Sequence, residues 1–223
     1  PQGQRAPGGG GAHVRYLRRA WSLVRSEWPK GLLALVVIGA LARAGIALAW
    51  GSSGIDPYDG DSASYITPAR SLLSDLSFSV GHFEADGRYT PEPMFVRTPG
   101  FPTLLAGVML VTGQEPIRWS MMLAGLSAFV ALPVFSAAQR LFPRRAAWIA
   151  VGVVLIDPLS VSSSTVIMTE TTQGFLLALL GLGLVVALQG GPYRMVGWGL
   201  AGATCALATL VRPSTYYLVV ILS

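Results

Sequence analysis

Charged side chains are scarce in this 223-residue chain, in which only 12% of the residues are charged and 52% are hydrophobic. A water-soluble domain carries about 25% charged residues, so about half of the usual charge is missing. The apolar residues form long blocks that are separated by short charged stretches. This pattern argues against a water-soluble domain and predicts an all-α fold, a polytopic bundle of membrane helices.

Cysteine and histidine are also rare. The single cysteine, Cys205, lies inside an apolar block, and the two histidines, His13 and His82, stand far apart in the sequence. One cysteine excludes a disulfide framework, and none of these residues has the spacing of a metal site. We therefore expect no cofactor, and the sequence gives no support for a divalent metal.

The basic residues stand at the borders of the apolar blocks, and no basic stripe interleaves with aromatic residues. The net charge of +5 therefore indicates contact with a membrane and no nucleic acid. Residues 1–30 form an arm with Gly and Pro at its start and a basic collar just before the first apolar block. By the positive-inside rule this arm is expected to be cytoplasmic, in a bacterial plasma membrane.

Residues 31–223 are expected to form the transmembrane domain, with an outer loop at 51–117. Both ends of the chain are expected to be truncated, because it starts at Pro1 and its last apolar block stops after a few residues. A span needs about 20 apolar residues. We place the spans, to within a few residues, at 31–50, 118–138, 146–162, 172–188 and 195–211.

The apolar stretch 99–113 sets the sidedness of everything that follows it. As a helix it would be about 22 Å long, which is short for a hydrocarbon layer of about 30 Å. If it crosses, the cluster Arg140, Arg144 and Arg145 falls outside the cell; if it stays on the outer face, this cluster is cytoplasmic. The second arrangement obeys the positive-inside rule, so we expect 99–113 to remain at the outer leaflet.

The outer loop is polar and acidic, and it contains apolar residues at helical spacing between Ala63 and Leu76. This spacing predicts an amphipathic helix along the membrane surface, with Asp61 and Ser62 at its N-terminus. In this topology five ionisable side chains from separate elements converge on the outer face: Asp61, Arg97, Asp157, Glu170 and Arg212.

Arg43 differs from the other arginines because it lies inside a predicted span. An ionisable residue at such a position is functional or paired by default. We expect it to bind substrate or to pair with Asp157 or Glu170, and a purely structural ion pair is the alternative.

Short segments of this sequence resemble family 39 of the GT-C glycosyltransferases, which includes protein O-mannosyltransferases and bacterial lipid A aminoarabinose transferases. The resemblance runs from about Gly31 to the end of the chain, in the order of the family. The segments that carry it are Asp61-Ser62-Ala63-Ser64-Tyr65, Arg97-Thr98-Pro99-Gly100-Phe101-Pro102, Thr169-Glu170 and Leu210-Val211-Arg212-Pro213.

This resemblance implies a GT-C-like fold and a glycosyltransferase that takes a sugar from a polyprenyl-phosphate donor on the extracytoplasmic face. The acceptor would be a lipid, a glycan or a protein. In the family the acidic residue of the first outer loop lies at the active centre, and Asp61 matches it. Many relatives have Asp-Glu there where this chain has Asp61-Ser62, which leaves the role of the second carboxylate open; Glu170 is the other candidate.

The chemistry of the residues agrees with this implication. An inverting transfer needs a carboxylate that accepts the proton of the attacking hydroxyl, which Asp61 could supply. A leaving phosphate needs cationic stabilisation, which Arg97 or Arg212 could supply because a guanidinium matches phosphate oxygens bidentately. Tyr65 is a candidate substrate contact.

Structural roles compete with each of these assignments. Asp61 and Glu170 could cap helices, since acidic residues are favourable in a first helical turn. Arg97 and Arg212 could extend to lipid headgroups, and Tyr65 could be an interfacial anchor.

Two other classes of function are open to a membrane bundle of this kind. In a transporter or flippase, Arg43 and Glu170 would line a substrate path near the midplane. A transporter would usually have interrupted helices at matching positions of two halves, and no such internal repeat is visible. A non-catalytic scaffold would not need carboxylates and arginines together on the outer face.

The predicted topology can be tested by cysteine labelling of intact cells. In a protein that lacks Cys205, a cysteine at Asp86 should react with an impermeant maleimide from outside, and a cysteine at Arg145 should react only after permeabilisation. Labelling of both positions from outside would contradict the arrangement.

Overall fold

The computed structural model describes residues 28–55, 57–58, 61–83, 89–94 and 97–217. The predicted basic arm, except for its last three residues, and Asp86 lie outside the described residues. Within the described part, the fold is an all-α bundle with a single two-stranded hairpin. This confirms the predicted fold class.

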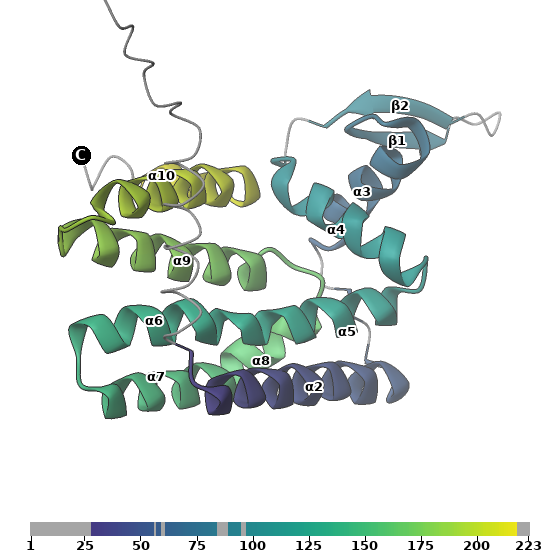
Figure 1. Ribbon diagram of the computed structural model, residues 1–223. Coiled ribbons are helices and arrows are strands. Elements are labelled where there is room, and N and C mark those ends of the chain that lie inside the picture. The colour runs from purple at the N-terminus through teal and green to yellow at the C-terminus, as the bar shows by residue number, and fades with distance from the viewer. Residues whose placement is uncertain (1–27, 56, 59–60, 84–88, 95–96, 218–223) are drawn as a thin grey trace, which may run out of the picture.

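The bundle is built from membrane-length helices (Figure 1). Among the described residues, four helical segments are long and apolar enough to cross a bilayer, or up to five if a bent pair of helices counts as one span. The four are α2 (Lys30–Ser52), the continuous run of α5 (Pro116–Ser127), η1 (Ala128–Val130) and α6 (Ala131–Leu141), α9 (Glu170–Leu188), and α10 (Arg194–Val211).

The predicted span 146–162 is not a single helix. It is broken into α7 (Arg144–Ile156) and α8 (Pro158–Thr165), which are bent by 44° relative to each other. The break lies at Asp157, where the chain is extended with φ −55° and ψ 118°, because the residue before a proline is disfavoured in the helical region. The eight residues of α8, about 12 Å of helix, lie between Asp157 and the segment that leads to α9. The expectation that Asp157 reaches the outer face stays a prediction.

Contacts between the helix ends show which ends lie together. Trp28, just before α2, donates a hydrogen bond from Nε1 to Oγ of Ser136 in α6 at 2.9 Å, and Gln189, after α9, donates from Nε2 to the carbonyl of Arg140 at 2.9 Å. These contacts gather the α6–α7 connection, with its basic cluster, at one end of the bundle. The other end carries α3, α4 and the hairpin (Figure 1).

At that second end, α3 (Ala63–Asp75) confirms the helix predicted at 63–76. It is followed by an antiparallel hairpin of β1 (Ser79–Phe83) and β2 (Tyr89–Pro93), which the sequence did not predict. Proline is disfavoured inside strands because it cannot donate to the ladder, and Pro91 and Pro93 both lie in β2. The isolated two-stranded pair tolerates them.

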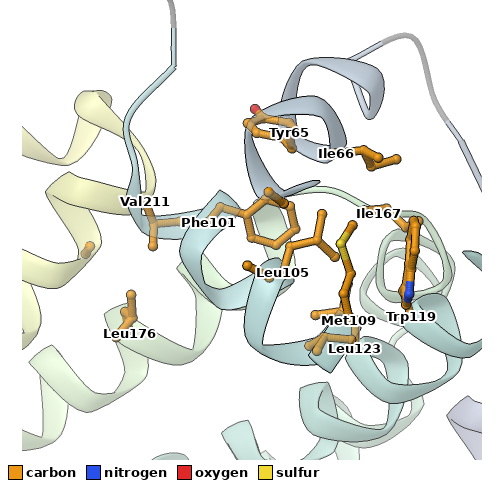
Figure 2. Close-up of a cluster of buried hydrophobic side chains, with 14 residues drawn as sticks. Tyr65, Ile66, Phe101, Leu105, Met109, Trp119, Leu123, Ile167, Leu176 and Val211 are labelled. Atoms are coloured by element: carbon orange, nitrogen blue, oxygen red, sulfur yellow. The ribbon is translucent and has the colours of Figure 1, made fainter. Parts of the chain in front are cut away.

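The apolar stretch 99–113 forms α4 (Gly100–Thr112), a helix of 13 residues. At about 1.5 Å per residue it is about 20 Å long, too short to cross the hydrocarbon layer. Instead it packs against α3, α5 and α10. Figure 2 shows Phe101, Leu105 and Met109 of α4 within a core that also contains Tyr65 of α3 and Trp119 of α5.

Helices α9 and α10 lie in close contact because glycines face each other across them. A Cβ on Gly183 would lie 2.7 Å from the backbone nitrogen of Ala201, and one on Gly197 would lie 2.4 Å from that of Ala187. Small residues allow this approach in membrane helices. A Cβ on the neighbouring Gly181 would meet nothing within 4 Å.

These contacts predict different effects for two alanine substitutions in α9. Gly183→Ala should destabilise the protein by about 1–3 kcal/mol, the usual cost of overpacking, because backbone must move to admit the methyl group. Gly181→Ala is the matched control, and it should be neutral or stabilising by up to about 1 kcal/mol, since alanine favours helix. Thermal unfolding of the purified variants in detergent measures both; equal effects would contradict the packing.

Candidate active site at the outer end of the bundle

Four charged side chains from separate elements surround one small cavity of about 90 Å³. Asp61 precedes α3, Arg97 precedes α4, Glu170 begins α9 and Arg212 follows α10. Tyr65 also lines the cavity. The structure therefore brings together five of the six site residues that the sequence predicts, although they span 152 positions of the chain.

Asp61 and Arg97 form the shorter ion pair of the site. Nη2 of Arg97 lies 2.6 Å from Oδ1 of Asp61, and its Nε donates a hydrogen bond to Oγ of Ser64 at 3.0 Å. The N-cap position of α3 is Ser62 rather than Asp61, and no side chain caps this helix. The carboxylate of Asp61 is thus engaged with the arginine instead of a helix end.

The ring of Tyr65 packs between this ion pair and the apolar core. Its side chain is almost fully buried, with an edge-to-face contact to Phe101 at 5.2 Å between ring centroids. The guanidinium of Arg97 lies over the same ring, 4.9 Å from its centroid, a distance at which a cation is attracted to the face of an aromatic ring. Tyr65 therefore holds the guanidinium of Arg97 at the edge of the apolar core.

Glu170 and Arg212 form a second ion pair, with Oε1 and Nη1 separated by 3.0 Å. Glu170 is the first residue of α9, where a carboxylate also interacts favourably with the helix dipole. The second oxygen, Oε2, is buried and lacks a hydrogen-bond partner among the described residues. One face of this carboxylate is therefore available to a ligand.

The segment 97–100 joins the two ion pairs, because it packs on the end of α10. Oγ1 of Thr98 donates a hydrogen bond to the carbonyl of Val211 at 3.2 Å. A Cβ on Gly100 would lie 2.6 Å from the carbonyl oxygen of Leu210, so only glycine admits this approach. Thr98 and Gly100 are thus the residues that place Arg97 beside Arg212.

The start of the outer loop is attached to the linker between α8 and α9 in a similar way. Oγ of Ser62 donates a hydrogen bond to the carbonyl of Ile167 at 3.0 Å, and the amide of Ile167 donates to the carbonyl of Pro57 at 3.1 Å. Ser62 and Ile167 are fully buried. These bonds hold Asp61 opposite Glu170.

A second, larger cavity of about 350 Å³ lies on the other side of Glu170. Its walls come from α5, η1, α7, α8 and α9. Its lining combines apolar residues such as Val130, Val153 and Phe175 with hydroxyl residues and with the carboxylates of Asp157 and Glu170. Ligand cavities are typically about 300–1,000 Å³, so this one is of the usual size and the small cavity is not. Glu170 lines both.

Arg43 is the predicted site residue that the structure places elsewhere. It is 1% exposed and does not line the small cavity. Its hydrogen-bond partners are the hydroxyls of Ser127 and Ser160 and backbone carbonyls of α7 and α8. The carboxylate of Asp157 acts on it electrostatically, without the direct ion pair that the sequence suggested. Its role in substrate binding stays a prediction.

Comparison with known families adds the chemical class. A sequence model of the dolichyl-phosphate-mannose-protein mannosyltransferase family matches residues 96–223, more than half of the chain. The chain belongs to this family. It is therefore a glycosyltransferase and an integral membrane protein, as the resemblance implied, and not the transporter that was the alternative. No curated protein and no solved structure matches it.

The mannosyltransferase match begins one residue before Arg97 and includes Glu170 and Arg212. Asp61 and Tyr65 precede it, so their assignment rests on the geometry and on the first motif. Sequence reasoning missed Ser64 and Thr98 as contacts of the site. Both lie inside the motifs that carry the resemblance. This location is the signal in the sequence that could have identified them as site contacts.

Among the described residues of this mannosyltransferase-family chain, no group of three or more His, Cys, Asp or Glu side chains could hold a metal ion. Asp61 and Glu170 are instead neutralised by arginines. The expectation that the protein has no cofactor stays a prediction, and the sequence leaves a divalent metal possible but unsupported.

The contact between Gly100 and α10 predicts how sensitive the site is to one methyl group. Gly100→Ala should lower stability by about 1–3 kcal/mol, because the Cβ would meet the backbone of Leu210. Gly107→Ala in the same helix is the control, since a Cβ there meets nothing within 4 Å. Thermal unfolding of both variants is the measurement. A Gly100→Ala protein as stable as the control would contradict the close contact between Gly100 and the backbone of α10.

Proposed function

We propose that this glycosyltransferase moves a sugar from a polyprenyl-phosphate donor to a lipid, glycan or protein acceptor on the extracytoplasmic face of the membrane. The observation that carries the proposal is the joint presence of two carboxylates and two arginines around one cavity at the end of the bundle. Transfer from a phosphate leaving group needs one group of each kind.

In the proposed reaction Asp61 is the general base. The acceptor hydroxyl gives its proton to the carboxylate of Asp61 while its oxygen forms a bond to the anomeric carbon of the sugar. The bond between that carbon and the phosphate oxygen breaks, and its electron pair leaves with the polyprenyl phosphate. Arg97 and Arg212 stabilise the charge of this phosphate, because charge-assisted hydrogen bonds from guanidinium groups are short and strong. The free oxygen of Glu170 would accept a hydroxyl of the sugar or the acceptor.

The ion pairs of the resting site suggest how donor binding prepares the base. Oδ1 of Asp61 is occupied by Nη2 of Arg97 at 2.6 Å, so this oxygen is not open to an acceptor hydroxyl. A donor phosphate competes with Asp61 for Arg97 and with Glu170 for Arg212. Phosphate binding would therefore release Asp61 from its partner at the moment when the acceptor needs a base.

The larger cavity supports a donor with a lipid chain. It lies next to the ion pairs, shares Glu170 with them, and has an apolar part of its wall formed by Val130, Val153, Val154 and Phe175. A polyprenyl chain could enter it while the phosphate stays with the arginines. The basic cluster Arg140, Arg144 and Arg145 belongs to the opposite end of the bundle, so the positive-inside rule supports an outer active site and a cytoplasmic N-terminus.

Replacement of Asp61 by asparagine tests the proposed base. Asp61→Asn keeps the size of the side chain and removes the basic carboxylate, so turnover with a polyprenyl-phosphate mannose donor should fall by about 100-fold or more. The protein should still fold, because Asp61 is half-exposed and such ion pairs contribute about 0–1 kcal/mol. Asp75→Asn, an exposed carboxylate at the end of the same helix, should leave turnover unchanged.

The arginines should give a different kinetic signature. Arg212→Gln should raise the KM for the donor as well as lower kcat, because a phosphate contact exists in both the ground state and the transition state.

Near-normal turnover of the full-length Asp61→Asn protein would remove Asp61 from the mechanism. An unchanged donor KM for Arg212→Gln would remove this arginine from the phosphate site.

A further inference from the structure

The buried Arg43 contacts the break between α7 and α8. Its Nη2 donates hydrogen bonds to the carbonyls of Val154 at 2.8 Å and Leu155 at 3.2 Å, the last turn of α7. Its Nη1 donates to Oγ of Ser127 at 2.7 Å, and both nitrogens lie 3.2 Å from Oγ of Ser160. An arginine in α2 thus holds the end of one half of the broken span and the start of the other.

The break leaves these carbonyls without their usual partners. In an α-helix the carbonyl of Val154 accepts a hydrogen bond from the amide four residues later, and that residue is Pro158, which has no amide hydrogen. The extended backbone at Asp157 also turns the next amides away from α7. In a bilayer no water satisfies such groups, so a neighbouring side chain must do so.

Arginine suits this task because its guanidinium carries several N–H donors in one plane. One nitrogen serves two carbonyls and the other serves two hydroxyls. The carboxylate of Asp157, which accepts a hydrogen bond from the amide of Ser160 at 2.7 Å and so caps α8, provides a nearby negative charge. A charge that would be costly within a span is therefore matched at both terminal nitrogens, while Nε is buried without a hydrogen-bond partner among the described residues.

The outer half of the broken span leads directly to the active site. Ser120 in α5 donates a hydrogen bond to the carbonyl of Thr165, the last residue of α8. Two residues later Ile167 is bonded to Ser62 and Pro57 in the outer loop, and Glu170 follows. The direction of α8 therefore sets where Glu170 stands relative to Asp61.

We propose that Arg43 is a positioning residue: it replaces the amide that Pro158 lacks, fixes the bend between α7 and α8, and so holds Glu170 opposite Asp61. The catalytic consequence rests on the function proposed above, whereas the structural consequence does not. The competing hypothesis is that Arg43 binds the substrate directly from behind the larger cavity, whose wall includes its partners Ser127, Val154 and Ser160.

The two hypotheses predict different effects of an Arg43 substitution when Pro158 is also replaced. Alanine at 158 restores an amide hydrogen and lets α7 continue. Arg43→Met should therefore lower the unfolding midpoint far less in a Pro158→Ala background. Pro116→Ala is the matched control, because Pro116 also opens a helix, α5, and none of the hydrogen bonds of Arg43 reaches it. Each variant would be made in the full-length protein, purified in detergent, and measured by thermal unfolding and by steady-state transfer from polyprenyl-phosphate mannose.

We expect Arg43→Met to lower both the unfolding midpoint and kcat, the latter by about tenfold or more, while the donor KM stays within about twofold, because no substrate contact is lost. Pro158→Ala should recover at least half of the loss in the unfolding midpoint but not the loss in kcat, because a continued α7 removes the bend that positions Glu170. Pro116→Ala should recover neither. Such a non-additive pair is the mark of two residues that act on the same structure.

Three results would overturn the inference. Losses in the unfolding midpoint that are equal in all backgrounds would show that Arg43 does not compensate for Pro158. A raised donor KM that Pro158→Ala does not lower would show a substrate contact. A normal kcat for a destabilised Arg43→Met protein would show that the residue does not position the site.

Arg43→Lys covers the case in which the methionine variant does not fold. One ammonium group cannot bridge two carbonyls and two hydroxyls as the guanidinium does, so a partial loss of stability is expected, and Pro158→Ala must recover this stability if the inference holds. Folding of Arg43→Met only together with Pro158→Ala would also support it. If the wild-type protein transfers no sugar from this donor, the proposed function fails, and the unfolding midpoints still decide whether Arg43 and Pro158 are coupled.

Discussion

Hydrocarbon offers no hydrogen-bond partner to a backbone amide or carbonyl, and much of this structure follows from that constraint. The apolar blocks form helices because a helix satisfies its own backbone. Where Pro158 removes an amide from the ladder, an arginine of another helix occupies the space and binds the free carbonyls. The close contact of α9 and α10 through Gly183 and Gly197 follows the related rule that helices in lipid associate by packing rather than by a hydrophobic driving force.

The same constraint explains where the charges of the site lie. Asp61, Arg97, Glu170 and Arg212 all stand at element ends at one end of the bundle, where charged groups can remain partly exposed. They form two ion pairs, so the formal charge of the cluster is zero. The small cavity between them, about 90 Å³, is below the usual size of a ligand cavity. The proposed phosphate donor would therefore have to displace the partners of these ion pairs.

The short motifs of the first and second outer segments combine chemistry with attachment. In the segment that starts at Arg97, the arginine faces the cavity, Thr98 binds the end of α10, and Gly100 allows the two backbones to touch. In the segment that starts at Asp61, Ser62 binds the linker before α9 while Ser64 and Tyr65 hold Arg97. The match to the mannosyltransferase family covers the segment that starts at Arg97, and the contacts of the structure join the segment that starts at Asp61 to it.

The sequence by itself determined the membrane class, the helices and the ends at which the charges gather, because hydrophobic length and charge at a border are local properties. The surface helix at 63–76 and the short helix at 99–113 were predicted from it for the same reason. The hairpin was missed because Pro91 and Pro93 oppose a strand in any local count. Only the tertiary structure decided the partners: that Asp61 pairs with Arg97 and Glu170 with Arg212, and that Arg43 binds carbonyls at the end of α7 rather than a carboxylate. These pairings depend on how helices far apart in the chain are packed and rotated against one another, and no local pattern of residues encodes that rotation.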